Sequence, residues 1–160
     1  MQRVRFYTDG SCDNNSKVGG WSFVVCERGL IKVTKGSEIN TTNNCMELLA
    51  VLRALQYAIK RKFKNVEVIL DSAYVFNVLE GKVYLEWIEK KWKTTKDEDI
   101  KNKEEWTKVL HSLERLEREN VKVTFTKIKA HSGISLNDRA DCNAKQAMKK
   151  RMKEEENFNG

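Results

Sequence analysis

The order in which strand-like and helix-like segments follow one another limits the folds open to this chain. Residues 3–9 alternate apolar and polar side chains at the spacing of a strand, and two further β-type runs follow at 20–26 and 31–36. The segment after Thr42 instead repeats apolar residues at helical spacing. Gly29 indicates a hairpin between the second and third strand-like segments. The elements predicted in chain order are strands at residues 3–9, 20–26 and 31–36, a helix at 44–60, a strand at 65–70, helices at 72–79 and 104–116, a strand at 121–128 and a helix at 136–152. This order predicts an α/β protein with a mixed five-stranded sheet and helices packed over it.

Length and composition are those of one folded domain. The 160 residues contain no Pro, no Gly-rich linker and no internal repeat, and 40% are hydrophobic, which excludes a disordered chain. We expect one domain over residues 1–153 and a polar tail at 154–160 that frays. The Lys- and Trp-bearing stretch between residues 79 and 104 is expected to be irregular.

Targeting signals are missing from the chain as given. No apolar stretch approaches the roughly 18 residues needed to cross a membrane. The first strand begins directly after Met1 without an apolar signal region, so we expect a cytoplasmic protein. The four cysteines form no Cys-x-x-Cys pair and have no His at zinc spacing, which favours free thiols over a disulfide or metal site.

Positive charge is concentrated in two places. Residues 121–153 hold nine Lys or Arg against two acids, in a chain whose net charge is +7. A second basic run, residues 60–64, closes the first predicted helix, where the alternative explanation is stabilisation of the helix dipole. A polyanionic partner follows, and nucleic acid is favoured over an anionic membrane because no strongly apolar helix face accompanies the charge.

Four acidic residues stand where local structure would prefer apolar ones. Asp9 lies in a strand-like run, and the alternative explanation for it is a turn formed by an Asp-Gly pair. Glu47 lies at the start of an apolar stripe on the predicted helix. The alternative explanation for it is stabilisation of the helix dipole in the first turn. Asp71 ends a short strand before Ser72, which could itself cap the next helix, and Asp141 lies on the apolar stripe of the last helix.

A metal site explains these four carboxylates together. Oxygen ligands favour Mg²⁺ or Mn²⁺ over zinc, and two such ions can activate water and stabilise the leaving oxygen in phosphodiester hydrolysis. We therefore predict that Asp9, Glu47, Asp71 and Asp141 bind metal. Asp138 is excluded, because its spacing from Ser135 fits a capping box.

Four motifs carry a resemblance to a known family. They are Thr8-Asp9-Gly10-Ser11-Cys12, Thr41-Thr42-Asn43-Asn44-Cys45-Met46-Glu47-Leu48, Leu70-Asp71-Ser72-Ala73-Tyr74-Val75, and Lys129-Ala130-His131-Ser132-Gly133 with Asn137-Asp138-Arg139-Ala140-Asp141. In this order and spacing the chain resembles cellular type I ribonuclease H. The resemblance implies a ribonuclease H-like fold with three antiparallel strands, two parallel additions and helices on both faces. It also implies endonucleolytic cleavage of the RNA strand of an RNA/DNA hybrid, leaving 5′-phosphate and 3′-hydroxyl ends.

The same resemblance assigns roles to further residues. His131 is similar to a residue that assists proton transfer or product release. Minor-groove contacts are implied for Asn15, Asn43 and Asn44, and a pocket for a DNA-strand phosphate for Thr42 and Asn102. An aromatic-bearing protrusion that cradles the DNA strand is implied for Trp87, Lys90, Lys91 and Trp92. The alternative for Trp87 is core packing, which is preferred for Trp21 and Trp106.

The chain also departs from the family pattern. Asn40 and Cys45 stand where relatives commonly carry Arg, and Ala73 replaces a polar residue that faces RNA. The protrusion, residues 82–105, holds seven Lys and seven acids, so apart from Lys90-Lys91-Trp92-Lys93 it is not a basic handle. We expect a monomeric, metal-dependent nuclease. The alternatives are a non-catalytic nucleic-acid-binding module and the nuclease domain of a reverse transcriptase.

Overall fold

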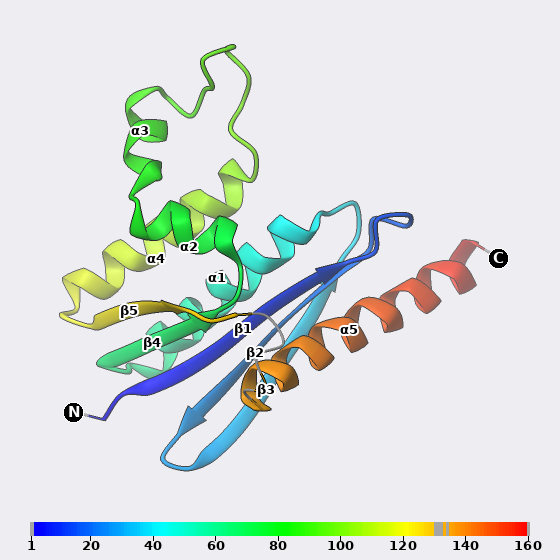
Figure 1. Ribbon diagram of the computed structural model, residues 1–160, viewed down its shortest axis with the longest axis horizontal. Coiled ribbons are helices and arrows are strands. Elements are labelled where there is room, and N and C mark those ends of the chain that lie inside the picture. Colours follow the sequence, from blue (N-terminus) through cyan, green and yellow to red (C-terminus); the bar gives the residue numbers. More distant parts are fainter. Residues whose placement is uncertain (1, 130–132, 134, 160) are drawn as a thin grey trace.

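One mixed sheet organises the described part of the chain, residues 2–129, 133 and 135–159 of a computed structural model (Figure 1). Its strands are β1 (Val4–Cys12), β2 (Gly19–Glu27), β3 (Leu30–Glu38), β4 (Asn65–Leu70) and β5 (Lys122–Lys127). In space they are ordered β3-β2-β1-β4-β5. The first three pair antiparallel, β4 lies parallel to β1, and β5 lies parallel to β4. The predicted sheet is confirmed.

Helices cover both faces of this sheet. They are α1 (Asn43–Arg61), α2 (Ala73–Glu80), α3 (Val83–Glu89), α4 (Lys103–Arg118) and α5 (Ser135–Asn159). Phe6 of β1 packs edge-on against Tyr57 of α1, whereas Ser11 of the same strand contacts Met148 of α5. Because alternate strand residues point to opposite faces, α1 and α5 lie on opposite sides of the sheet (Figure 1). The prediction of helices on both faces is confirmed.

Capping side chains fix where two of the helices begin. The Thr42 hydroxyl accepts a hydrogen bond from the Cys45 N–H at 3.1 Å, and the Ser72 hydroxyl accepts one from the Val75 N–H at 3.1 Å. Both oxygens satisfy an N–H that has no partner inside its own helix. Thr42 and Ser72 are therefore the N-cap residues of α1 and α2, which confirms the capping role predicted for Ser72, and Asn43 is the first residue of α1.

The stretch expected to be irregular contains a helix. α3 forms there because its apolar side chains have a surface to pack on, and Trp87 lies between Trp92 and Trp106 with ring centroids 5.8 and 5.7 Å away. Trp106 is fully buried and Trp21 is 9% exposed, so both are core residues as predicted.

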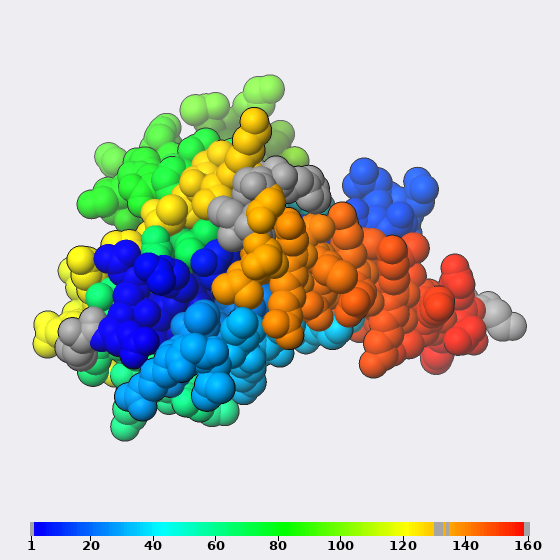
Figure 2. Space-filling view, turned by 60° about the horizontal axis from the view of Figure 1, so that its bottom comes forward, coloured from blue at the N-terminus to red at the C-terminus, as the bar shows by residue number. Residues whose placement is uncertain are grey.

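The last helix is longer than predicted. α5 continues to Asn159, so the expectation of a frayed tail from residue 154 is wrong. Oppositely charged residues at helical spacing support this extension, and Arg151 pairs with Glu155 at 2.8 Å. Figure 2 shows α5 lying across the strands with its C-terminal turns projecting beyond them. In the described residues, no helix has the length and apolar character that crossing a membrane requires.

Candidate metal centre

Asp9 and Asp71 meet because β1 and β4 run parallel in register. Thr8 pairs with Leu70, so the next residue of each chain segment brings the two carboxylates side by side. Asp9 lies inside β1 and is only 5% exposed. The alternative that Asp9 begins a turn is therefore wrong.

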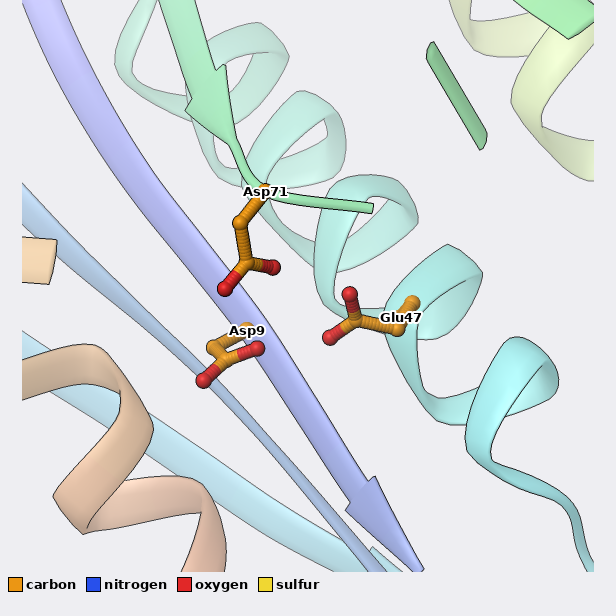
Figure 3. A group of neighbouring side chains, drawn as sticks. All are labelled: Asp9, Glu47 and Asp71. Carbon is orange, nitrogen blue, oxygen red and sulfur yellow. The ribbon is translucent and has the colours of Figure 1, made fainter. Parts of the chain in front are cut away.

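Glu47 reaches the same point from α1 because the helix backbone touches the strand at Gly10. A Cβ at position 10 would lie 2.3 Å from the Glu47 nitrogen, so glycine is required for this approach. The Gly10 N–H donates to the Glu47 carboxylate. Glu47 lies beyond the first turn of α1, which excludes dipole stabilisation as its role. One carboxylate oxygen from each of Asp9, Glu47 and Asp71 lies within 4.8 Å of the other two (Figure 3).

Asp141 approaches from the opposite face of the sheet, on α5. This helix touches β2 at Gly20, where a Cβ would lie 2.1 Å from the Ala144 carbonyl oxygen. The Asp141 carboxylate is close enough to hydrogen-bond with Asp9, and it pairs with Lys145 at 3.2 Å. The fold thus brings Asp9, Glu47 and Asp71 into one group and places Asp141 beside Asp9, at the edge of that group. Sequence reasoning missed Gly20, whose signal was a glycine inside a strand-like segment.

Two sequence predictions fall at or beside residues outside the described part of the chain. His131 itself is one of those residues. Ser135, the N-cap of the predicted capping box, is the first described residue of α5, and residue 134 before it is also outside, so the capping box stays a prediction. Asp138 is exposed in the first turn of α5, where a carboxylate stabilises the helix dipole.

Ionising this cluster is unfavourable without a compensating cation. Burial is the largest cause of a rise in the pKa of Asp9 from 3.8 to about 7; contacts with Asp141 and Asp71 add to the rise, while a hydrogen bond with Glu47 opposes it. Burial, reinforced by Asp9, also raises the pKa of Glu47 well above its ordinary value. A divalent cation would compensate these charges, and the ligands are all oxygens. The residues therefore fit the predicted Mg²⁺ or Mn²⁺.

The residues predicted to contact nucleic acid lie at the β1–β2 loop, the starts of α1 and α4, and the protrusion. They are Asn15, Thr42, Asn43, Asn44, Trp87, Lys90, Lys91, Trp92 and Asn102. All are exposed except Trp87, Trp92 and Asn102, which are half-buried. Trp87 and Trp92 each bury part of their surface against the other. Lys90 forms an ion pair with Glu86 at 2.8 Å.

A pocket of about 290 Å³ lies between the starts of α1 and α4. Asn40 and Cys45, two of the departures from the family pattern, line it. Glu38, Glu104 and Glu105 also line it, against two basic residues. Acids outnumber bases here, so the interior of this pocket is a poor site for a phosphate.

Comparisons with known proteins agree on one family. The RNase H family model matches residues 1–149. Ribonuclease H of Caldicellulosiruptor saccharolyticus is 41% identical over 149 residues, covering 93% of this chain and 98% of that protein, and the ribonuclease H of Syntrophomonas wolfei gives the same figures. Among solved structures, LC9-RNase H1, a type 1 RNase H with the type 2 active-site motif, superposes with a TM-score of 0.76 at 23% identity, covering 91% of this chain and 72% of that chain. RNase H1 of Halobacterium salinarum gives 0.68 at 23% identity, covering 93% and 99%. The two structures support the fold alone.

Proposed function

This chain belongs to the ribonuclease H family, and we propose that it hydrolyses the RNA strand of RNA/DNA hybrids by a two-metal mechanism that leaves 5′-phosphate and 3′-hydroxyl ends. Family membership makes it a nuclease acting on RNA/DNA hybrids and confirms the resemblance inferred from the motifs. The observation that supports the mechanism is the convergence of carboxylate oxygens within 4.8 Å. A non-catalytic binding module would have no use for so costly a cluster.

Asp9, Glu47, Asp71 and Asp141 would hold the cations, with Mg²⁺ as the first candidate and Mn²⁺ as the second. When bound, two such cations activate a water and stabilise the leaving oxygen of the phosphodiester. The four carboxylates must lose their protons to bind them, and the Gly10 N–H holds Glu47 in place. Asp9 and Glu47 are buried whereas Asp71 and Asp141 are half-buried, so the substrate would approach from the side of the latter pair.

Substrate contacts are proposed on the same basis. Asn15, Asn43 and Asn44 present exposed amides for the minor groove, where ribose 2′-hydroxyls distinguish RNA from DNA. The Thr42 hydroxyl accepts its capping bond and keeps its proton for a phosphate oxygen. His131 would assist proton transfer or product release.

The protrusion would contribute contact area more than charge. Lys90 is already paired with Glu86, which leaves Lys91 as the better candidate for a phosphate contact. The exposed parts of Trp87 and Trp92 would meet the DNA strand. Residues 1–153 would form the catalytic domain of a cytoplasmic monomer.

A cleavage assay on end-labelled duplexes tests this function. The wild-type chain should cut the RNA strand of an RNA/DNA hybrid in Mg²⁺, leave double-stranded DNA and double-stranded RNA intact, and lose activity in EDTA. Enzymatic mapping of the products should find 5′-phosphates and 3′-hydroxyls. Asp9→Asn is the matched inactive control. Cleavage that persists in EDTA, or in Asp9→Asn, would refute the metal mechanism.

A further inference from the structure

Tyr74 of α2 links two residues at the start of α4. Its hydroxyl oxygen accepts a hydrogen bond from the Trp106 indole N–H at 2.8 Å and another from the Asn102 side-chain amide at 3.1 Å. The rings of Tyr74 and Trp106 meet edge-on with centroids 5.9 Å apart. Trp106 is fully buried, so the Tyr74 hydroxyl is held in a fixed position.

The hydrogen-bonding capacity at this point is incompletely used. A phenol oxygen accepts two hydrogen bonds and donates one, and both acceptor positions of Tyr74 are taken. The Asn102 amide has two N–H groups, of which one goes to Tyr74. Within the described residues, nothing accepts the Tyr74 proton or the second Asn102 N–H. Asn102 is half-buried, so its free N–H can reach a ligand at the surface.

Asn102 does not behave as an asparagine at its position usually does. It is the N-cap residue of α4, where an Asn side chain normally turns back to accept an N–H of the first helical turn. Here no side-chain capping bond forms. The contact with Tyr74 keeps the amide turned away from its own helix, whose first turn carries Glu104 and Glu105.

We propose that Tyr74 is a positioning residue for substrate binding: its hydroxyl holds the Asn102 amide clear of the α4 N-terminus, ready to donate to a backbone phosphate of the bound hybrid. This inference rests on the proposed function, because it takes Asn102 as a substrate contact. It assigns Tyr74 two separable roles. The bond from Trp106 stabilises the fold, and the bond from Asn102 orients a ligand-binding side chain.

A double-mutant cycle separates the two roles. Hybrid affinity is measured by fluorescence anisotropy in the Asp9→Asn background, which prevents cleavage, for Tyr74→Phe, Asn102→Ala and the double variant. Each single substitution should weaken binding about tenfold, the size expected for a lost hydrogen bond to a charged group. Tyr74→Phe should cause no further loss once Asn102 is Ala. Thermal unfolding should show Tyr74→Phe destabilised in both backgrounds, because the buried Trp106 N–H loses its acceptor in each.

Tyr57→Phe is the matched control, since Tyr57 is also half-buried but packs in a different aromatic cluster, against Phe23 and Phe63. It should leave hybrid affinity unchanged. In the cleavage-competent chain, Tyr74→Phe should raise KM and preserve kcat. An equal loss of affinity for Tyr74→Phe in both Asn102 backgrounds would overturn the proposal, as would full affinity in Tyr74→Phe or Asn102→Ala. A wild-type chain that neither binds nor cuts hybrid would instead refute the proposed function.

Discussion

Replacing Asp9 by Asn should stabilise the protein when no divalent cation is present. Asp9 is 5% exposed and its carboxylate faces three other acids. Asn has nearly the same shape, keeps hydrogen-bonding capacity and carries no charge. The substitution therefore removes an electrostatic cost from the folded state while leaving packing almost unchanged.

The size and pH dependence of this effect follow from the raised pKa. Raising the pKa of Asp9 from 3.8 to about 7 on folding costs about 4 kcal/mol of stability once the group is ionised in both states. The sign is fixed: the folded state binds the proton more tightly, so the wild type is unpenalised below about pH 4. The free energy of unfolding of the wild type then falls by about 1.4 kcal/mol per pH unit between pH 4 and 7, and it falls no further above pH 7.

Urea unfolding in EDTA at a series of pH values measures this difference. The stability gap in favour of Asp9→Asn should be near zero at pH 4 and should reach its full value by pH 7.5. Added Mg²⁺ should then stabilise the wild type, by about 2.7 kcal/mol at a hundred times its Kd, and should leave Asp9→Asn unchanged. A gap that does not vary with pH, or an Asp9→Asn protein less stable than the wild type at pH 7.5 in EDTA, would refute the reasoning.

Further predictions concern the other parts of the site. Gly10→Ala should lower the free energy of unfolding by about 3 kcal/mol and abolish cleavage, because its Cβ would push against the α1 backbone. Gly29 has open space around it, so Gly29→Ala should lower the free energy of unfolding by about 1 kcal/mol and stay active. Asp141→Asn should lose cleavage of labelled hybrid and Asp138→Asn should retain it, and the reverse result would show that the two were wrongly assigned. His131→Ala should slow turnover by ~10²–10⁴-fold, so an unchanged steady-state rate would contradict its role.

The sheet was predictable because β1 begins with a period of two, β2 and β4 are apolar runs of strand length, and Gly29 marks the turn between β2 and β3. What local pattern could not show is packing at a distance. The helix at Val83–Glu89 depends on Trp87 finding Trp106, which lies on another helix. The extension of α5 to Asn159 depends on ion pairs such as that between Arg151 and Glu155, in a segment whose polarity alone indicated fraying.

The carboxylates of the site were predictable as misfits that share a metal site, but the contacts that bring them together were not. An acid inside a strand, or on an apolar helix face, is visible in sequence because it conflicts with its neighbours. Tyr74 conflicts with nothing locally, and the only local sign at Gly20 is a glycine in a strand-like segment. Their importance comes from Ala144 and Asn102, partners that only the folded chain brings close.

The surroundings of Asp9 explain why the site is centred on β1. β1 has a parallel neighbour on one side, which delivers Asp71 in register, and helices above and below it. Glu47 of α1 reaches the site only because Gly10 has no side chain. In the same way, α5 lies close enough to the sheet to place Asp141 beside Asp9 only because Gly20 has none. Two glycines on adjacent strands, facing opposite sides of one sheet, therefore set the spacing of the carboxylates. Substituting either should disturb one carboxylate while leaving the others in register, which makes the two faces of the site separable by mutation.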